Sequence, residues 1–303
     1  MKKLIMAVAV ILGWVMTAQA TEVSPSEYRR IYGRYGKSDG PYQRRDTNGF
    51  ELITGDATRG VSLGKCVYED FSEYGDGDDF CIQSDNTGCS GTAGEVDLIY
   101  LPSGNKMACE ILGTQTILGA VDMDAGSLDI SGDQTADDGV ECAWGVHGAS
   151  GGAFTIGTDP AFYTCATFTI ADVSGSDDFH LGFRVANDGD TDTGGFNQTF
   201  DNYHDLYAVS MISGDIYTSS IAGDAATSET DTTANWADAA EHTICVYVSA
   251  AGVVTPKVDG LEPATYGAYT FTDAESVIPF FHMLQDTDLT GEVDLTEWEV
   301  GYQ

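Results

Sequence analysis

Residues 162–171 read FYTCATFTIA, and this stretch decides the fold class. Successive side chains of a β-strand point to opposite faces, so one face here carries Phe162, Thr164, Ala166, Phe168 and Ile170. A period of two is typical of a strand with one buried face and one face in water. We therefore expect residues 162–171 to form a strand of an antiparallel sheet.

Similar short stretches recur at regular spacing toward the C-terminus. Strands are predicted at residues 127–131, 180–185, 206–212, 215–221, 243–249, 253–258, 268–271, 277–283 and 292–302. Ser213-Gly214 and Ala250-Ala251-Gly252 each lie between two of them, which predicts two hairpins. No long window after residue 20 has helical periodicity. The pattern predicts an all-β, antiparallel β-sandwich or jelly roll over residues 119–303.

The same region carries a resemblance to a known family. Its residues are the runs 168–178, 182–184, 209–216, 235–238, 246–254, 259–260 and 298–301. Together they resemble the jelly-roll domain common in structural proteins of tailed bacteriophages, marine ones especially. The likeness extends from about residue 120 to the end of the sequence. It implies a concanavalin-A-like sandwich with a capsid-decorating, fibre or tail-associated role in a virion.

The first 20 residues have the form of a secretory signal peptide. Lys2 and Lys3 precede an apolar run at 4–15, and Ala18-Gln19-Ala20 suits a signal peptidase. A retained anchor is the alternative, but the run is shorter than the ~20 residues that span a bilayer. We expect a secreted, extracellular protein with no membrane partner after cleavage, and a virion location as the alternative.

Charge is distributed very unevenly along the chain. The 13 basic residues face 48 acidic ones, a formal net charge of -35. Six bases lie within a Tyr-rich arm at residues 21–46, namely Arg29, Arg30, Arg34, Lys37, Arg44 and Arg45. The acidic body repels phosphate backbones, so we expect no nucleic-acid partner. The arm is either disordered or an assembly arm that docks on the acidic body of a neighbouring copy, which would make a homo-oligomer.

Seven cysteines predict disulfides in an exported chain. Two bridges are expected among Cys66, Cys81, Cys89 and Cys109, within a small cysteine-stapled unit at residues 47–118. Of the remaining three, Cys142, Cys165 and Cys245, at least one is expected to be free or intermolecular. Zinc is the competing interpretation, but the sequence contains no CxxC pair.

Two acidic stretches are candidate calcium sites. Residues 286–297, DTDLTGEVDLTE, have the spacing of an EF-hand loop, with oxygen ligands at Asp286, Asp288, Thr290, Asp294 and Glu297. The flanking residues look like strands rather than helices, so an acidic turn is the alternative. The other stretch contains Asp188, Asp190 and Asp192, for which a solvated loop is the alternative. Calcium is the only cofactor that these patterns suggest.

An enzymatic interpretation of the same segment depends on Glu292, Asp294 and Glu297. These residues resemble the ExDxxE strand of laminarinase-type glycoside hydrolases, which implies a nucleophile, a tuning carboxylate and a general acid/base. Here, however, the motif lies in the last predicted strand. We expect no catalytic residues and a structural or adhesive protein of a virion or extracellular surface. A secreted, lectin-like glycan-binding module is the alternative, followed by a hydrolase.

Overall fold

The computed structural model describes residues 42–46, 49–53, 67–73, 81–83, 96–100, 106–112, 121–124, 126–130, 139–144, 154–173, 178–186, 200–284 and 293–303. The chain forms two compact units, Met1–Thr54 and Gly55–Gln303. In the first unit, β1 (Tyr42–Asp46) and β2 (Gly49–Ile53) form an antiparallel hairpin. Arg44 and Arg45 of the predicted arm belong to β1. Arg29, Arg30, Arg34, Lys37 and the predicted signal peptide lie outside the described residues.

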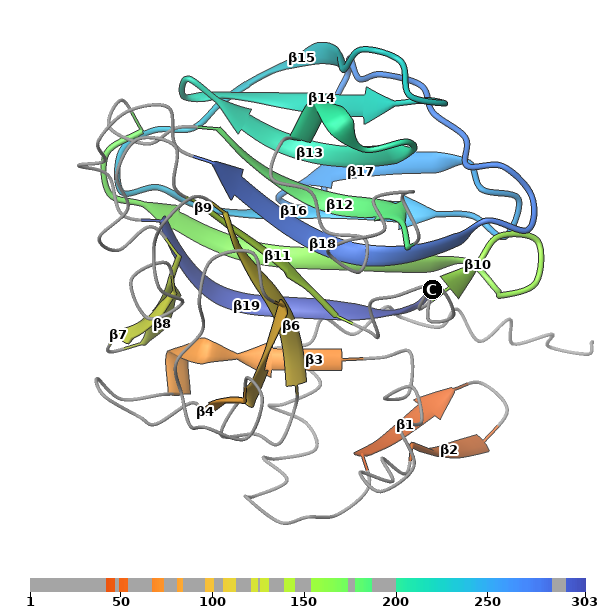
Figure 1. Cartoon of the computed structure of the whole chain (residues 1–303), viewed down its shortest axis with the longest axis horizontal. Helices are drawn as coiled ribbons and strands as arrows, with labels where there is room; N and C mark the ends of the chain where they lie inside the picture. The colour runs from red at the N-terminus through yellow and green to blue at the C-terminus, as the bar shows by residue number, and fades with distance from the viewer. Residues whose placement is uncertain are drawn as a thin grey trace, which may run out of the picture. The chain divides into compact units, whose positions relative to one another are not determined.

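The second unit is a sandwich of two antiparallel sheets (Figure 1). Over the described residues, the small sheet has the order β17-β16-β11-β19-β8-β7, with β3 on β19. Its strands are β3 (Val67–Asp70), β7 (Asp122–Asp124), β8 (Ser127–Asp129), β11 (Phe162–Ile170), β16 (Glu241–Val248), β17 (Val254–Val258) and β19 (Val293–Tyr302).

The large sheet has the order β15-β14-β13-β12-β18-β9-β6-β5-β4, with β10 on β18. Its strands are β4 (Cys81–Gln83), β5 (Val96–Tyr100), β6 (Lys106–Leu112), β9 (Gly139–Ala143), β10 (Phe154–Thr155), β12 (Phe179–Val185), β13 (Leu206–Ile212), β14 (Asp215–Ile221), β15 (Ser228–Asn235) and β18 (Ser276–Leu284). The helical elements described are the short 3-10 turns η1 (Phe71–Glu73) and η2 (Phe200–Asn202). The predicted all-β, antiparallel fold is confirmed. Within the described residues, no helix is both long and apolar enough to cross a bilayer.

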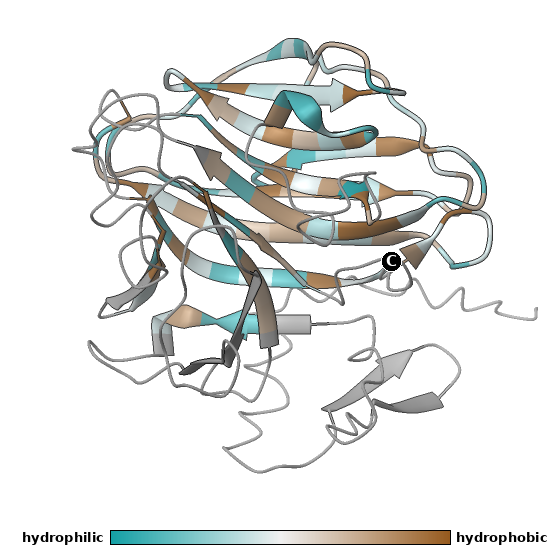
Figure 2. Cartoon of the chain, in the orientation of Figure 1, coloured by the Kyte–Doolittle hydropathy of each residue, from teal (hydrophilic) through white to brown (hydrophobic). Residues whose placement is uncertain are grey.

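The main core lies between the two sheets and is built by the alternation seen in the sequence. All five residues on the predicted inner face of β11 are buried, Thr164 included. The Trp298 indole explains this polar exception, because its Nε1 donates to Thr164 Oγ1 at 2.9 Å. Figure 2 shows hydrophobic residues interspersed with hydrophilic ones along many of the strands, while β18 is hydrophobic along most of its length.

Both predicted hairpins are confirmed, and backbone conformation explains them. Ser213 and Gly214 have φ values of 52° and 86°, so both centres of the β13–β14 turn are left-handed, as a type I′ turn requires. In the β16–β17 turn, Gly252 has a φ of 82°. A Cβ there would lie 2.4 Å from the Phe271 carbonyl oxygen, so this position also requires glycine.

Other sequence expectations differ from the structure. Residues 268–271, expected as a strand, belong to a strap, residues 259–275, which connects β17 to β18 and makes a bridge from Thr270 to Val253. The edge strand β15 was missed because SETDTTAN has no apolar alternation. β3 pairs with β19, and β6 pairs with β9. The two compact units divide between residues 54 and 55, and the boundary expected at 118/119 stays a prediction.

The disulfide prediction was wrong in its pairing. Cys109 bonds to Cys142, and Cys165 bonds to Cys245. In each pair the two cysteines are directly opposite on neighbouring strands, with Cα atoms 4.1 Å apart. Strand order, which sequence spacing cannot give, decides the pairing. Cys66 and Cys89 lie outside the described residues. Disulfides of this kind are consistent with an extracellular protein.

Candidate functional site

The structure describes only part of the predicted calcium sites. Asp286, Asp288, Thr290, Asp188, Asp190 and Asp192 lie outside the described residues, as does Glu292. Asp294 and Glu297 are half-buried in β19, and Asp294 Oδ1 accepts a hydrogen bond from Ser127 Oγ at 2.8 Å. β19 begins at Val293, so the end of the EF-hand-like pattern is strand and not the start of a helix. Among the described side chains no metal-binding group of three is present, and calcium stays a prediction.

The strap, residues 259–275, is held at the edge of the sandwich by backbone and side-chain hydrogen bonds. Val254 N donates to the Tyr269 carbonyl at 3.2 Å, and Phe271 N donates to the Gly252 carbonyl at 3.0 Å. On the other side, Gly267 N donates to Thr218 Oγ1 of β14 at 2.8 Å. The strap is therefore hydrogen-bonded both to the small sheet at β17 and to the large sheet at β14.

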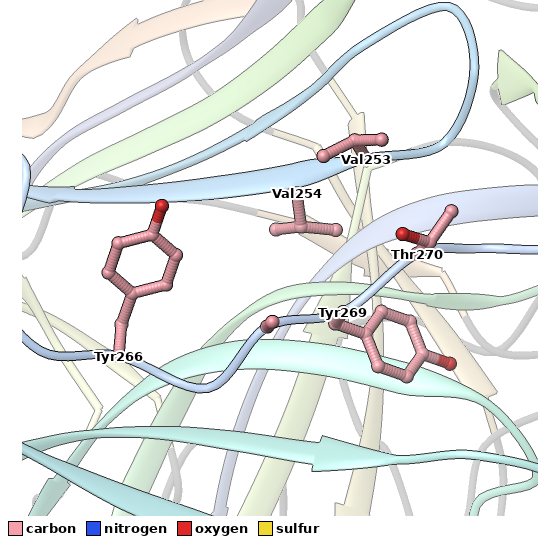
Figure 3. A pocket seen from close by; sticks show the side chains of 6 residues that line it. Val253, Val254, Tyr266, Tyr269 and Thr270 are labelled. Carbon is pink, nitrogen blue, oxygen red and sulfur yellow. The ribbon is translucent and has the colours of Figure 1, made fainter.

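A pocket of about 250 Å³ opens between β17 and the strap. It is lined by Val253, Val254, Tyr266, Ala268, Tyr269 and Thr270 (Figure 3). The Tyr266 ring lies on the strap and directs its hydroxyl toward the strand that carries Val254. Val253 is 50 % exposed, which is unusual among the large hydrophobic side chains that the structure describes. The pocket combines an apolar wall with phenol and hydroxyl groups.

Hydrogen bonds hold both tyrosines in place. Tyr266 Oη donates to Glu262 Oε1 at 2.7 Å, and this bond, followed by burial, raises the pKa of the Tyr266 phenol. Tyr269 Oη lies 3.0 Å from Asp205 Oδ1 and 2.8 Å from the Ile221 carbonyl oxygen. Burial and the Asp205 charge raise the Tyr269 pKa far above its usual value of 10.0. Both phenols are neutral at physiological pH, but the Tyr269 hydroxyl is directed away from β17 and toward its partners Asp205 and Ile221, so Tyr266 supplies the phenol hydroxyl on the pocket side (Figure 3).

The outer face of the large sheet holds a row of buried polar residues. Direct cross-strand pairs place Ser210, His180, His282, Glu141 and Glu110 side by side on β13, β12, β18, β9 and β6. These five side chains, which we call the polar row, are between 0 and 6 % exposed. This face was expected to meet water. Instead it carries a second apolar cluster that includes Leu206, Ile278 and Phe280.

Residues 200–205, which we call the aromatic cover, lie on this face. The Phe200 ring stacks on the His180 ring with centroids 3.7 Å apart and planes 16° from parallel. Tyr203 Oη donates to Glu141 Oε2, and the Arg184 guanidinium lies 5.0 Å from the centre of the Tyr203 ring. Arg184 Nε also donates to Glu141 Oε1 at 2.6 Å, with both side chains fully buried.

Sequence reasoning missed both the pocket and the polar row. His180 and His282 are 102 positions apart in the numbering, and each was taken as an isolated histidine. Alternation in FHLGFRV and in SVIPFFHML does place them opposite the core-facing phenylalanines. What alternation cannot supply is the pairing of β12 with β18 and of β18 with β9, which brings the row together.

No protein-family model matches this chain, and no curated protein matches it. The chain is similar in fold to the carbohydrate recognition domain of Emp46p in its potassium-bound form, at 10 % identity and a TM-score of 0.43, over 60 % of this chain and 85 % of that one. A galectin, LEC-6 of Caenorhabditis elegans, matches at 13 % identity and a TM-score of 0.33, over 53 % and 91 %. An alginate lyase from Pseudomonas aeruginosa matches at 9 % and 0.41, over 61 % and 86 %. Such values describe a shared sandwich architecture alone, and the resemblance to bacteriophage domains stays a prediction.

Proposed function

We propose that this chain is an exported, non-enzymatic glycan-binding β-sandwich protein that holds a sugar ring in the pocket between β17 and the strap. The observation that carries the proposal is the pairing of two anchored tyrosines, Tyr266 and Tyr269, with the apolar wall of Val253 and Val254. A pyranose ring has an apolar C–H face and a rim of hydroxyls, so it needs both kinds of surface.

The size and charge of the pocket limit the class of ligand that it can bind. A volume of about 250 Å³ suits a single sugar ring, so we expect the site to bind one residue of a glycan and leave the rest in water. The lining contains no charged side chain, and the protein as a whole carries a net charge of -35. Anionic sugars are repelled by such a field, and neutral glycans are therefore the expected class.

The test is a glycan array followed by calorimetry on the full mature chain. Neutral glycans should bind, with and without a chelator, because no carboxylate lines the pocket. Tyr266→Ala should weaken binding at least tenfold. Tyr163→Ala, on the outer face of the small sheet, is the matched control and should bind as the wild type does. Equal binding by wild type and Tyr266→Ala would place the site elsewhere, and hydrolysis of a bound glycan would contradict the non-enzymatic assignment.

A further inference from the structure

We propose that His180 and His282 form an acid-sensitive latch, which keeps the aromatic cover closed on the large sheet at neutral pH and releases it on acidification. This device does not depend on the function of the glycan pocket, although the last residue of the cover, Asp205, also contacts Tyr269 Oη at 3.0 Å. The cover is residues 200–205, and the surface beneath it is the outer face of β12, β18 and β9.

The geometry places the two imidazoles under the cover. His180 and His282 are direct cross-strand partners on β12 and β18, and their ring centroids are 5.9 Å apart. Phe200 contacts both rings, at centroid distances of 3.7 Å and 5.6 Å. Tyr203 approaches the His282 ring edge-on at 6.3 Å. Any charge that appears on these rings therefore appears beneath aromatic side chains and out of water.

The hydrogen bonds of His180 connect it to neutral partners. Its Nδ1 lies 2.7 Å from Ser210 Oγ, and Ser210 Oγ donates to Ser219 Oγ at 2.9 Å. Because the Ser210 hydroxyl donates its proton to Ser219, it must accept a hydrogen bond from His180. The Nδ1 atom of His180 therefore carries a proton. Neither serine carries a negative charge that could compensate protonation of the ring.

The charged groups facing the pair come from several strands. On the sheet they are Arg184 on β12, Glu141 on β9, Glu110 on β6 and Tyr217 on β14. The cover itself carries the ionisable side chains of Asp201, Tyr203, His204 and Asp205. His282 is the direct cross-strand neighbour of Glu141, whereas the neighbours of His180 are Ser210 and His282. Protonation of His180 would therefore place a positive charge on a buried ring that lies beside another imidazole.

The direction of the pH effect follows from linkage. Burial, and then repulsion from His282, lower the pKa of His180 well below its usual 6.5. With the cover open, His180 meets water and regains a pKa near 6.5, so the open form binds the proton more tightly. As pH falls below about 6.5, the opening constant should rise by about tenfold per pH unit until His180 in the closed form also protonates.

Opening would expose an apolar surface that is hidden at neutral pH. The second apolar cluster consists of Ala108, Ala143, Ala186, Phe200, Tyr203, Leu206, Ala208, Ile221, Ile278 and Phe280. Most of these residues lie on sheet strands and would stay in place while Phe200 and Tyr203 leave. Acidification would thus present a preformed hydrophobic patch, the type of surface that marks interaction sites.

Hydrogen–deuterium exchange on the full mature chain, with its disulfides intact, tests the latch between pH 7.5 and pH 4.5. Protection factors of residues 200–206, corrected for intrinsic exchange, should fall at least tenfold below about pH 6. The change should reverse at pH 7.5 and be accompanied by binding of a fluorescent hydrophobic dye. His180→Gln keeps a partner for Ser210 but cannot take up a proton, so its cover should stay protected.

The matched control is His242→Gln, because His242 lies on the small sheet and its Nδ1 contacts Asp259 Oδ2 at 2.8 Å near the surface. This variant should open as the wild type does. Should His180→Gln fail to fold, titration of the His180 imidazole by NMR in the wild type replaces it. A cover that stays protected at pH 4.5, an unchanged transition in His180→Gln, or a His180 that titrates at 6.5 or above would each overturn the proposal.

Discussion

Arg184 and Glu141 form an ion pair in which neither side chain has any exposed surface, and Nε lies 2.6 Å from Oε1. Arg184 lies on β12 and Glu141 on β9, and β18 lies between these two strands. The Arg184 guanidinium lies 6.0 Å from the centre of the Phe280 ring on β18. A buried pair of this kind adds little net stability relative to an apolar replacement, but its loss leaves one uncompensated charge. The pair connects β12 to β9 across β18, and Glu141 also accepts a hydrogen bond from Tyr203 of the cover.

The first prediction concerns this pair. Arg184→Met should lower the free energy of unfolding by about 3–5 kcal/mol, because Glu141 then stays buried without its cation. Urea denaturation followed by tryptophan fluorescence measures the change. The double variant Arg184→Met/Glu141→Gln should be destabilised by clearly less than the sum of the two single variants. Additive losses would show that the two side chains do not depend on each other.

The second prediction concerns Gly182, which lies between β13 and β18 on β12 and has no space for a side chain. A Cβ at this position would lie 2.0 Å from the Tyr207 carbonyl oxygen and 2.7 Å from Ala208 Cα, both backbone atoms of the adjacent strand. Gly182→Ala should therefore cost about 3 kcal/mol or more, since the strands must separate. Thermal unfolding measures the loss.

A matched glycine gives the control for this prediction. At Gly267, the nearest atoms to a Cβ would all be side-chain atoms, with the hydroxyl oxygens of Thr230 and Thr218 at 3.3 Å and 3.4 Å. These contacts are much longer than those at Gly182 and involve no backbone atom, so Gly267→Ala should change stability by less than about 1 kcal/mol. Equal effects at the two positions would contradict the argument from backbone contact.

The third prediction concerns the disulfides. Replacing Cys165 and Cys245 together by alanine should reduce the free energy of unfolding by about 2–5 kcal/mol. The same replacement of Cys109 and Cys142 should cost about 0.8 kcal/mol less, because this bridge closes a loop of 33 residues rather than 80. Chemical denaturation gives both values. Peptide mapping without reduction checks the pairing, and a link from Cys109 to Cys66 or Cys89 would contradict it.

Particular residues show how far the sequence could be interpreted. The inner face of β11 and the Ser213-Gly214 hairpin followed directly from local rules, because alternation and left-handed turn residues act over a few positions. The row from His180 to Glu110 did not, because it needs the order of strands distant in sequence. The pocket was missed for a related reason: Tyr266 and Tyr269 were not part of any motif, and only the strap's hydrogen bonds bring them to Val253.

The same distinction explains why one edge of the large sheet was overlooked. β15 is polar and exposed along most of its length, so its sequence carries no apolar pattern. It pairs with β14 through a register shift, and Thr233 has a φ of 66° at that irregularity. Edge strands with bulges and acidic side chains resist pairing with other chains. The polar, irregular sequence of β15 therefore has two consequences: it lacks the apolar pattern that predicts a strand, and it protects the sheet edge from pairing with other chains.

The last prediction concerns stability at high pH. Burial raises the pKa of Tyr207 far above its usual 10.0, and burial together with the Asp205 charge does the same for Tyr269. Below about pH 9 both phenols are protonated in the folded and unfolded states, so neither makes stability pH-dependent there. Above pH 10 the unfolded chain loses these protons while the folded chain keeps them, and the free energy of unfolding must fall.

Urea midpoints measured from pH 8 to pH 11.5 should therefore decline. The slope of the free energy of unfolding against pH should correspond to a contribution of up to two protons from these two phenols. Tyr269→Phe and Tyr207→Phe should each remove up to one proton from this slope, and the double variant should remove both contributions. An alkaline profile that is identical in the double variant and the wild type would show that neither phenol is held neutral by the fold.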